Sequence, residues 1–215
     1  MPYFFEDLVR RYRGRGPCAC GRTHAIGARD VIVGRGALER SAAMLAAALP
    51  GGGTAWVLSD GRTEEAAGRA WKRHVGGARI AAKVLPGEPK PVPTIELVHE
   101  LAAEARATGA SLIVGIGSGV IADLAKHVSH VIGIPNWAVA TAGSVDAYSS
   151  ATAAIRVEGY HRALPTAVSV HIAADFDVRT VELPHFGRND NQYICVLDCF
   201  VRPTVDSADD GLGVP

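Results

Sequence analysis

A strand pattern runs directly into three closely spaced glycines and then into a helical pattern. Residues 111–114 are predicted as a buried strand, and residues 120–131 have apolar side chains at helical spacing. Gly115, Gly117 and Gly119 allow the backbone to turn tightly and to approach a ligand. Amide hydrogens at the start of the following helix attract anions. The stretch predicts a nucleotide- or phosphate-binding loop or, alternatively, a glycine turn that serves packing alone.

Strand and helix patterns alternate through the first 140 residues, as a parallel sheet requires. The predicted fold class is α/β, with a Rossmann-like parallel sheet, flanking helices and a small β-hairpin at residues 151–164. Strands are predicted at residues 31–33, 54–58, 80–85, 111–114 and 136–140, and helices at 3–12, 37–49, 63–74, 94–107 and 120–131.

Length and charge limit the classes of function. The 215 residues, 48% of them hydrophobic, are enough to bury the core of one domain. The 22 basic and 22 acidic residues balance, so no broad positive field favours nucleic acid or an anionic membrane. Glycine or charge interrupts the apolar stretches before membrane-spanning length, and residues 1–7 lack the order of a secretion signal. We expect a cytoplasmic protein that acts on a small molecule.

Polar residues follow three of the predicted strands, at the edge where open parallel sheets bind ligands. Asp60 follows the strand at 54–58 and can accept hydrogen bonds from a ribose, although it can equally cap the next helix. The glycine stretch follows a second strand. Residues 141–150 follow a third, and their hydroxyls and single carboxylate suit either a binding loop or an ordinary turn.

These three segments together resemble the glycerol-1-phosphate dehydrogenase branch of a superfamily that also holds iron-containing alcohol dehydrogenases, glycerol dehydrogenases and dehydroquinate synthases. The later family motif Thr-Ala-x-Ser-x-Asp-x-Tyr-x-Ser matches residues 141–150, and residues 18–24 and 34–38 are similar to the opening of bacterial members. The resemblance covers roughly the first 178 residues. The family's glycine loop runs into an Asp and a Lys at the spacing of Gly117, Ser118, Gly119, Asp123 and Lys126.

The resemblance implies reduction of dihydroxyacetone phosphate to sn-glycerol 1-phosphate by hydride transfer from NADH or NADPH, bound by residues 1–178. Asp146 would be the catalytic residue that contacts the substrate, and Asp60 would hold the adenosine ribose and favour NAD. Gly143, Val145 and Ala147 replace Pro, Met and Gly of the family, which affects loop shape and substrate choice. The remaining cofactor contacts by motif match are Gly117, Ser118, Gly119, Val120 and Asp123 for the pyrophosphate, Thr141 and Ser144 for the nicotinamide end, and Ser150.

The segment 179–215 departs from the family, whose second, all-helical domain supplies an Asp and two His that bind catalytic zinc or iron. This segment has scattered prolines and no sustained helical period, so an irregular tail is predicted. His185 and Asp190 lack the family's Gly-x-Gly-Asp setting, and the two cysteine pairs lack the spacing and fourth ligand of a zinc site. No metal ligand is assigned. Loss of the metal would remove stabilisation of the developing alkoxide, so we expect a shortened relative with impaired catalysis.

Three alternatives stay open. One is an NAD-binding regulatory module that acts with another chain, and the second is a remnant whose exposed sheet face drives self-association into a homo-oligomer. The third is a cyclase similar to dehydroquinate synthase, against which the match at residues 141–150 counts. The remaining histidines are predicted to have surface or packing roles, because no carboxylate partner is identifiable for His127, His130, His161 or His171.

Overall fold

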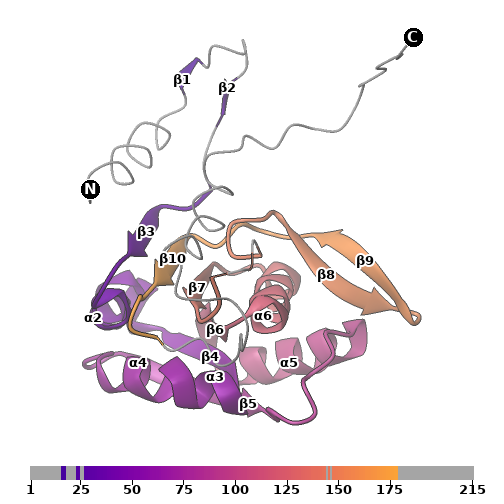
Figure 1. Ribbon diagram of the computed structural model, residues 1–215, viewed down its shortest axis with the longest axis horizontal. Coiled ribbons are helices and arrows are strands. Elements are labelled where there is room, and N and C mark those ends of the chain that lie inside the picture. Colours follow the sequence, from indigo (N-terminus) through magenta and orange to yellow (C-terminus); the bar gives the residue numbers. More distant parts are fainter. Residues whose placement is uncertain (1–15, 18–22, 25–26, 144, 146, 179–215) are drawn as a thin grey trace, which may run out of the picture.

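The computed structural model describes residues 16–17, 23–24, 27–143, 145 and 147–178. The predicted helix at 3–12, all four cysteines, Ser144, Asp146 and the predicted tail at 179–215 lie outside the described residues. Within them, helices cover both faces of a six-stranded parallel sheet, and a two-stranded hairpin lies beside it (Figure 1). The α/β fold class, the Rossmann-like sheet and the small hairpin are confirmed.

The strands of the sheet lie in the spatial order β3-β10-β7-β6-β4-β5, and every neighbouring pair is parallel. Their bounds are β3 Asp30–Val33, β4 Thr54–Asp60, β5 Arg79–Leu85, β6 Ala110–Gly117, β7 Asn136–Ala140 and β10 His171–Ala174. The antiparallel pairs are β1 Gly16–Pro17 with β2 Thr23–His24, and β8 Thr152–Val157 with β9 Tyr160–Pro165. The helices are α2 Ala37–Ala48, η1 Pro50–Gly52, α3 Gly61–Thr63, the π-helical η2 Glu64–Gly68, α4 Arg69–Arg73, α5 Ile95–Ala107 and α6 Gly119–Ile132.

Every strand and helix predicted within the described residues is present, with bounds that shift by a few residues. Strand β10 was not predicted. Its four residues are all buried, and it pairs with β3 through Ile172 and Val31 and with β7 through Ile172 and Ala138. Two of its four residues are alanines, which strands disfavour, so the local sequence does not indicate a strand and β10 is determined by its two distant neighbours.

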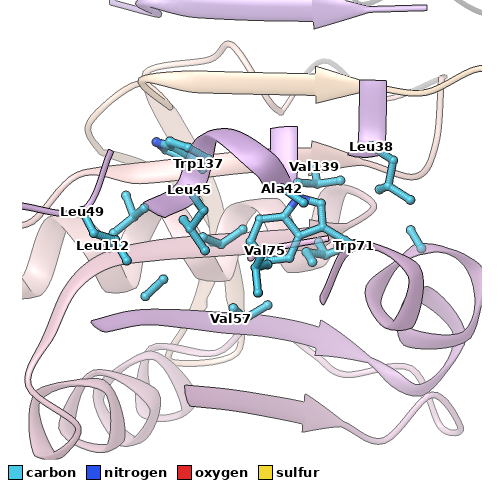
Figure 2. Close-up of a cluster of buried hydrophobic side chains, with 14 of the residues drawn as sticks. Leu38, Ala42, Leu45, Leu49, Val57, Trp71, Val75, Leu112, Trp137 and Val139 are labelled. Atoms are coloured by element: carbon cyan, nitrogen blue, oxygen red, sulfur yellow. The ribbon is translucent and has the colours of Figure 1, made fainter. Parts of the chain in front are cut away.

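The sheet has a separate apolar core on each face, because successive side chains of a strand point to opposite faces. On one face, Leu45 of α2 and Trp71 of α4 pack against sheet residues that include Val57 and Val114 (Figure 2). On the other face, α5 and α6 cover the sheet, and β8 of the hairpin adds to this second core. Its members include Trp56, Leu58, Leu101, Ile113, Leu124, Val128, Ala153 and Ile155.

The connections that leave β4 and β6 go to opposite faces of the sheet. Strand β4 leads through α3 and η2 to α4 in the first core, whereas β6 leads to α6 in the second core. Since β4 and β6 are direct neighbours, their carboxyl ends form the topological switch point at which open α/β sheets bind ligands.

One buried histidine makes stability depend on pH. His171 is 1% exposed, stacks on Trp137 with ring centroids 4.2 Å apart, and has Nε2 3.0 Å from the Ser41 hydroxyl. Burial lowers the pKa of His171 from 6.5 to about 4, against a smaller opposing effect of Asp30. His127 shifts in the same direction, because burial and the neighbouring His130 and His99 lower its pKa.

We therefore expect the free energy of unfolding to fall as pH drops from 6.5 towards 4, by on the order of 3 kcal/mol. Between these values the unfolded chain binds a proton that the folded chain excludes. The stabilising contribution of neutral His171 is therefore complete above pH 6.5 and is lost progressively as the pH falls from 6.5 to about 4. Urea unfolding at several pH values measures this slope. The variant His161→Gln changes an exposed histidine of β9 and should keep the slope, whereas a flat profile in the parent chain would contradict burial of neutral His171.

Candidate functional site

The start of α6 presents backbone amides that have no acceptor within the helix. Ser118 is the N-cap residue, with extended backbone at φ −86° and ψ −165°, and among the described residues its side chain caps no amide. The first bond within the helix runs from the Ala122 amide to the Ser118 carbonyl, at 2.9 Å. The amides of Gly119, Val120 and Ile121 precede that bond, so they can donate to an anion.

Two of the three glycines serve packing between β6 and α6. A Cβ atom on Gly115 would lie 2.7 Å from the Ala125 Cβ, and one on Gly117 would lie 2.4 Å from the Ile121 Cβ. Both glycines belong to β6, and none of the three has the left-handed φ that a tight glycine turn uses. Gly115 and Gly117 therefore have a packing role, and the turn is tight without a left-handed glycine, because Ser118 alone separates β6 from α6. Anion binding by this stretch stays a prediction.

Gly117→Ala is expected to lower the free energy of unfolding by about 2 kcal/mol, because its Cβ would overlap Ile121 close to the helix backbone. Gly77→Ala is the matched control, since a Cβ there meets no atom of the described chain within 4 Å. Urea unfolding measures both. In an Ile121→Gly background, which removes the Cβ that the new methyl would meet at 2.4 Å, the cost of Gly117→Ala should shrink, and equal costs in the two backgrounds would contradict the proposed contact.

Tyr148 fixes the loop after β7 onto the end of β6. Its hydroxyl donates to the Gly117 carbonyl at 2.9 Å and to the Ala142 carbonyl at 3.3 Å, and the Thr141 amide also donates to Gly117. Tyr148 is 2% exposed, and burial raises its pKa far above the ordinary value, so it remains a neutral donor. Ser144 lies between these anchors but outside the described residues.

Lys126 fixes the far end of the same loop. Its side chain is buried, and Nζ donates to the carbonyls of Ser150 and Thr152 at 3.4 and 2.5 Å. The Asp123 carboxylate lies 3.4 Å from the same amine. Ser150 turns its hydroxyl back onto the Thr152 backbone. The loop therefore meets α6 through the buried amine of Lys126, a role that the motif match did not reveal.

Asp60 ends β4 and begins the next helix. Its Oδ1 accepts from the amides of Arg62 and Thr63 at 3.0 and 2.9 Å, and the Thr63 hydroxyl accepts from the Asp60 amide at 3.0 Å. The capping alternative is thus confirmed. A contact between Asp60 and a ribose stays a prediction, and the second carboxylate oxygen is not used by this cap.

A partly buried ion pair supports the helix behind Asp60. The Glu64 carboxylate accepts from Ser59 at 2.8 Å and from Lys72 at 2.7 Å. Burial acts to raise the pKa of Glu64, but the bonds from Lys72 and Ser59 outweigh it and the net pKa is lowered. Gly68 makes room for this carboxylate, since its Cβ would lie 2.4 Å from Glu64 Oε2. The start of the β4 connection is therefore held rigidly.

The loop after β5 rests directly on the loop after β4. A Cβ on Gly61 would lie 3.2 Å from the Gly87 nitrogen, and one on Gly87 would lie 3.0 Å from the Arg62 nitrogen. The Arg62 guanidinium also forms an ion pair with Glu88. Glycine at both positions thus lets α3 and the loop after β5 touch, and the Arg62–Glu88 ion pair links them.

Among the described residues, the candidate site segments that follow β7, β6 and β4 lie in one row along the carboxyl edge of the sheet. Pairing aligns Gly117 with Ala140, which precedes Thr141, and Asp60 with Leu85, which precedes the Gly87 loop. The order across the edge is therefore the β7 loop, the start of α6, Asp60 and the β5 loop. Val120 and Asp123 follow on α6, Ser150 lies at the far end of the β7 loop, and Ser144 and Asp146 are outside the described residues.

In the described part of the chain, no group of three or more His, Cys, Asp or Glu side chains lies close enough together to hold a metal ion. His185 and Asp190, considered above for such a role, are outside it. No helix there has the length and apolar character needed to cross a bilayer.

Comparison with known proteins gives consistent matches. Residues 32–181 match the family profile described as iron-containing alcohol dehydrogenase. Glycerol-1-phosphate dehydrogenase (NAD(P)+) from Methanosarcina acetivorans is 30% identical over 150 residues, which are 70% of this chain and 41% of that protein. The enzyme of the same name from Methanosarcina mazei is 30% identical over 176 residues, 79% of this chain and 48% of that one. The chain thus spans less than half the length of the curated relatives it matches.

Solved structures support the same fold. Glycerol dehydrogenase from Schizosaccharomyces pombe superposes with a TM-score of 0.59 at 20% identity, over 70% of this chain and 38% of that one. An iron-containing alcohol dehydrogenase from Thermotoga maritima gives a TM-score of 0.62 at 17% identity, over 72% and 47% of the two chains. At these identities the likeness concerns the arrangement of the sheet and its helices.

Proposed function

Because the chain belongs to the iron-containing alcohol dehydrogenase family, we propose that residues 27–178 bind NAD(H) or NADP(H) as the nucleotide-binding part of an sn-glycerol-1-phosphate dehydrogenase. The observation that carries this proposal is the row of loops along the carboxyl edge, centred on the switch point between β4 and β6. The names of the two Methanosarcina relatives give glycerol 1-phosphate, and its oxidised form, dihydroxyacetone phosphate, is the proposed substrate for reduction.

The start of α6 suits the diphosphate of a dinucleotide. Gly119, Val120 and Ile121 offer three amides without an acceptor in the helix, and the positive end of the helix dipole favours the anion. Glycine at position 119 leaves room for the side chain of Val145, since a Cβ there would lie 3.3 Å from a methyl carbon of Val145. With the diphosphate there, the adenosine ribose extends to Asp60 on β4 and the nicotinamide to Thr141 after β7.

The nicotinamide supplies the hydride that reduces a carbonyl carbon when the cofactor is bound. The residues of this chain position the two reactants. Tyr148 and Lys126 hold the loop at 141–150 against β6 and α6, so that side chains in this loop reach the nicotinamide end at a fixed place. In our proposal Thr141 and Ser144 contact that end, Ser150 contacts the cofactor, and Asp146 contacts the substrate.

The family name implies iron, but the described residues hold no fitting set of ligands. No step is therefore assigned to a metal here. The described residues support the proposal of nucleotide binding, and an assay of NADH oxidation tests turnover.

Two measurements on the purified chain test the proposal. Calorimetric titration should give saturable binding of NADH, and absorbance at the nicotinamide band reports turnover of NADH with dihydroxyacetone phosphate, with and without added zinc or iron. Absence of nucleotide binding would contradict the proposal. Binding without turnover would favour the nucleotide-binding module, and ordinary turnover would refute the expectation of impaired catalysis.

A further inference from the structure

The loops after β4 and β5 place an arginine and a glutamate beside the proposed ribose site. Arg62 follows Asp60 by two residues, and its amide donates to Asp60 Oδ1 at 3.0 Å. Its side chain extends over Gly87, where an added Cβ would lie 3.2 Å from Arg62 Cγ, and the guanidinium pairs with Glu88. The side chain of Arg62 is 31% exposed and that of Glu88 is 67% exposed, so a ligand can reach both.

NADH and NADPH differ at this place by one phosphate on the adenosine ribose. A carboxylate at the end of the strand accepts hydrogen bonds from the ribose hydroxyls and repels that phosphate, whereas a nearby arginine accommodates it. This chain has both features, Asp60 and Arg62, within two residues of each other. Whether the repulsion by Asp60 or the attraction by Arg62 is stronger depends on how far the positive charge of Arg62 is already neutralised. Glu88 neutralises it by forming an ion pair with Arg62.

The other lysines near these segments either pair with a different carboxylate or lie farther from Asp60 in the sequence. Lys72 forms an ion pair with Glu64, and Lys83 on β5 forms one with Glu104. Lys90 follows Glu88 by two residues and is exposed. The Arg62 guanidinium therefore lies nearest in the chain to Asp60 among these cations, and its pairing with Glu88 determines the local charge.

We propose that the Arg62–Glu88 ion pair determines the cofactor specificity of this site and makes the chain bind NADH more tightly than NADPH. With the pair closed, the phosphate of NADPH meets two carboxylates and a cation that is already neutralised. With Glu88 uncharged, Arg62 turns to the phosphate. This inference rests on the proposed function, in that a dinucleotide must bind along this edge.

Fluorescence titrations with NADH and NADPH on the full chain test the inference. We expect the parent chain to bind NADH at least about tenfold more tightly than NADPH, since the phosphate meets net negative charge. Glu88→Gln should tighten NADPH binding about fivefold and leave NADH within a factor of two, because only one screened charge pair changes. Adding Arg62→Gln to Glu88→Gln should remove that gain. Glu65→Gln, an exposed acid of the same helix, should leave the preference as it is.

The outcomes separate the inference from the function on which it rests. If the parent chain binds NADH but Glu88→Gln leaves NADPH affinity unchanged, the inference is overturned and nucleotide binding stands. If NADPH binding stays tighter when Arg62→Gln is added to Glu88→Gln, the effect comes from the removal of a negative charge alone, and the inference is again overturned. If the parent chain binds neither nucleotide, the proposed function fails and the inference fails with it. Thermal unfolding should change little in Glu88→Gln, since Glu88 is exposed, so a change in its NADPH affinity reports on the site.

Discussion

Gly119→Asp is expected to weaken NADH binding by about a hundredfold or more, with only a small loss of stability from its Cβ, which would lie 3.3 Å from a methyl carbon of Val145. The new carboxylate would occupy the first turn of α6, where the proposed diphosphate lies, and two negative charges a few ångströms apart repel strongly in a partly buried site. The same carboxylate favours the helix, because it interacts well with the helix dipole and replaces glycine. Loss of binding therefore cannot be explained by unfolding.

Two variants separate charge from size and place. Gly119→Asn fills nearly the same volume without a charge, and we expect it to reduce NADH affinity by much less than Gly119→Asp. Gly77→Asp adds the same charge far along the chain from the site, where a Cβ meets no atom of the described residues, and should leave affinity unchanged. Calorimetric titration measures affinity, and urea unfolding measures stability. Retained NADH binding in Gly119→Asp would place the diphosphate somewhere other than the start of α6.

Lys126→Met is expected to lower the free energy of unfolding by about 4 kcal/mol, because removal of one partner from a buried ion pair leaves the other polar groups without compensation. The carbonyls of Ser150 and Thr152 lose a charged donor, and Asp123 loses a cation at 3.4 Å. The loop at 141–150 also loses its anchor on α6, so NADH affinity should fall as well. Urea unfolding and NADH titration measure the two effects.

The control is Lys90→Met, which changes an exposed lysine in the loop after β5. It should shift the unfolding free energy by less than about 0.5 kcal/mol. If Lys126→Met is equally mild, the buried amine does not anchor Ser150 and Thr152 on α6, and the proposed role of Lys126 is contradicted.

Local pattern was sufficient to predict most of the fold. Residues 111–131 carry a strand period and then a helix period, and the structure has β6 and α6 there. Asp60 was predicted at the end of a strand, with a capping role as one of two alternatives, because both roles need only the local order of residues. The carboxyl-edge row follows from these positions once the sheet is known to be parallel.

The contacts that could not be predicted join residues far apart in the sequence. Strand β10 gains its place from pairing with β3 and β7, which lie 30 or more residues away. The packing role of Gly117 depends on how closely Ile121 approaches, and the role of Lys126 depends on where the chain returns at Ser150. No periodicity in a single segment encodes such distances. The roles of Asp146 and Ser144 stay predictions, since both lie outside the described residues.

Backbone amide NMR during titration with NADH tests most directly whether the diphosphate binds at the start of α6. We expect the largest shifts at the amides of Gly119, Val120 and Ile121, with smaller shifts at Asp60 and Thr141 along the same edge. The amide of Gly109, which precedes β6 at the opposite edge, should not move. Shifts that leave the three α6 amides unchanged, or that centre on Gly109, would contradict binding at the carboxyl edge.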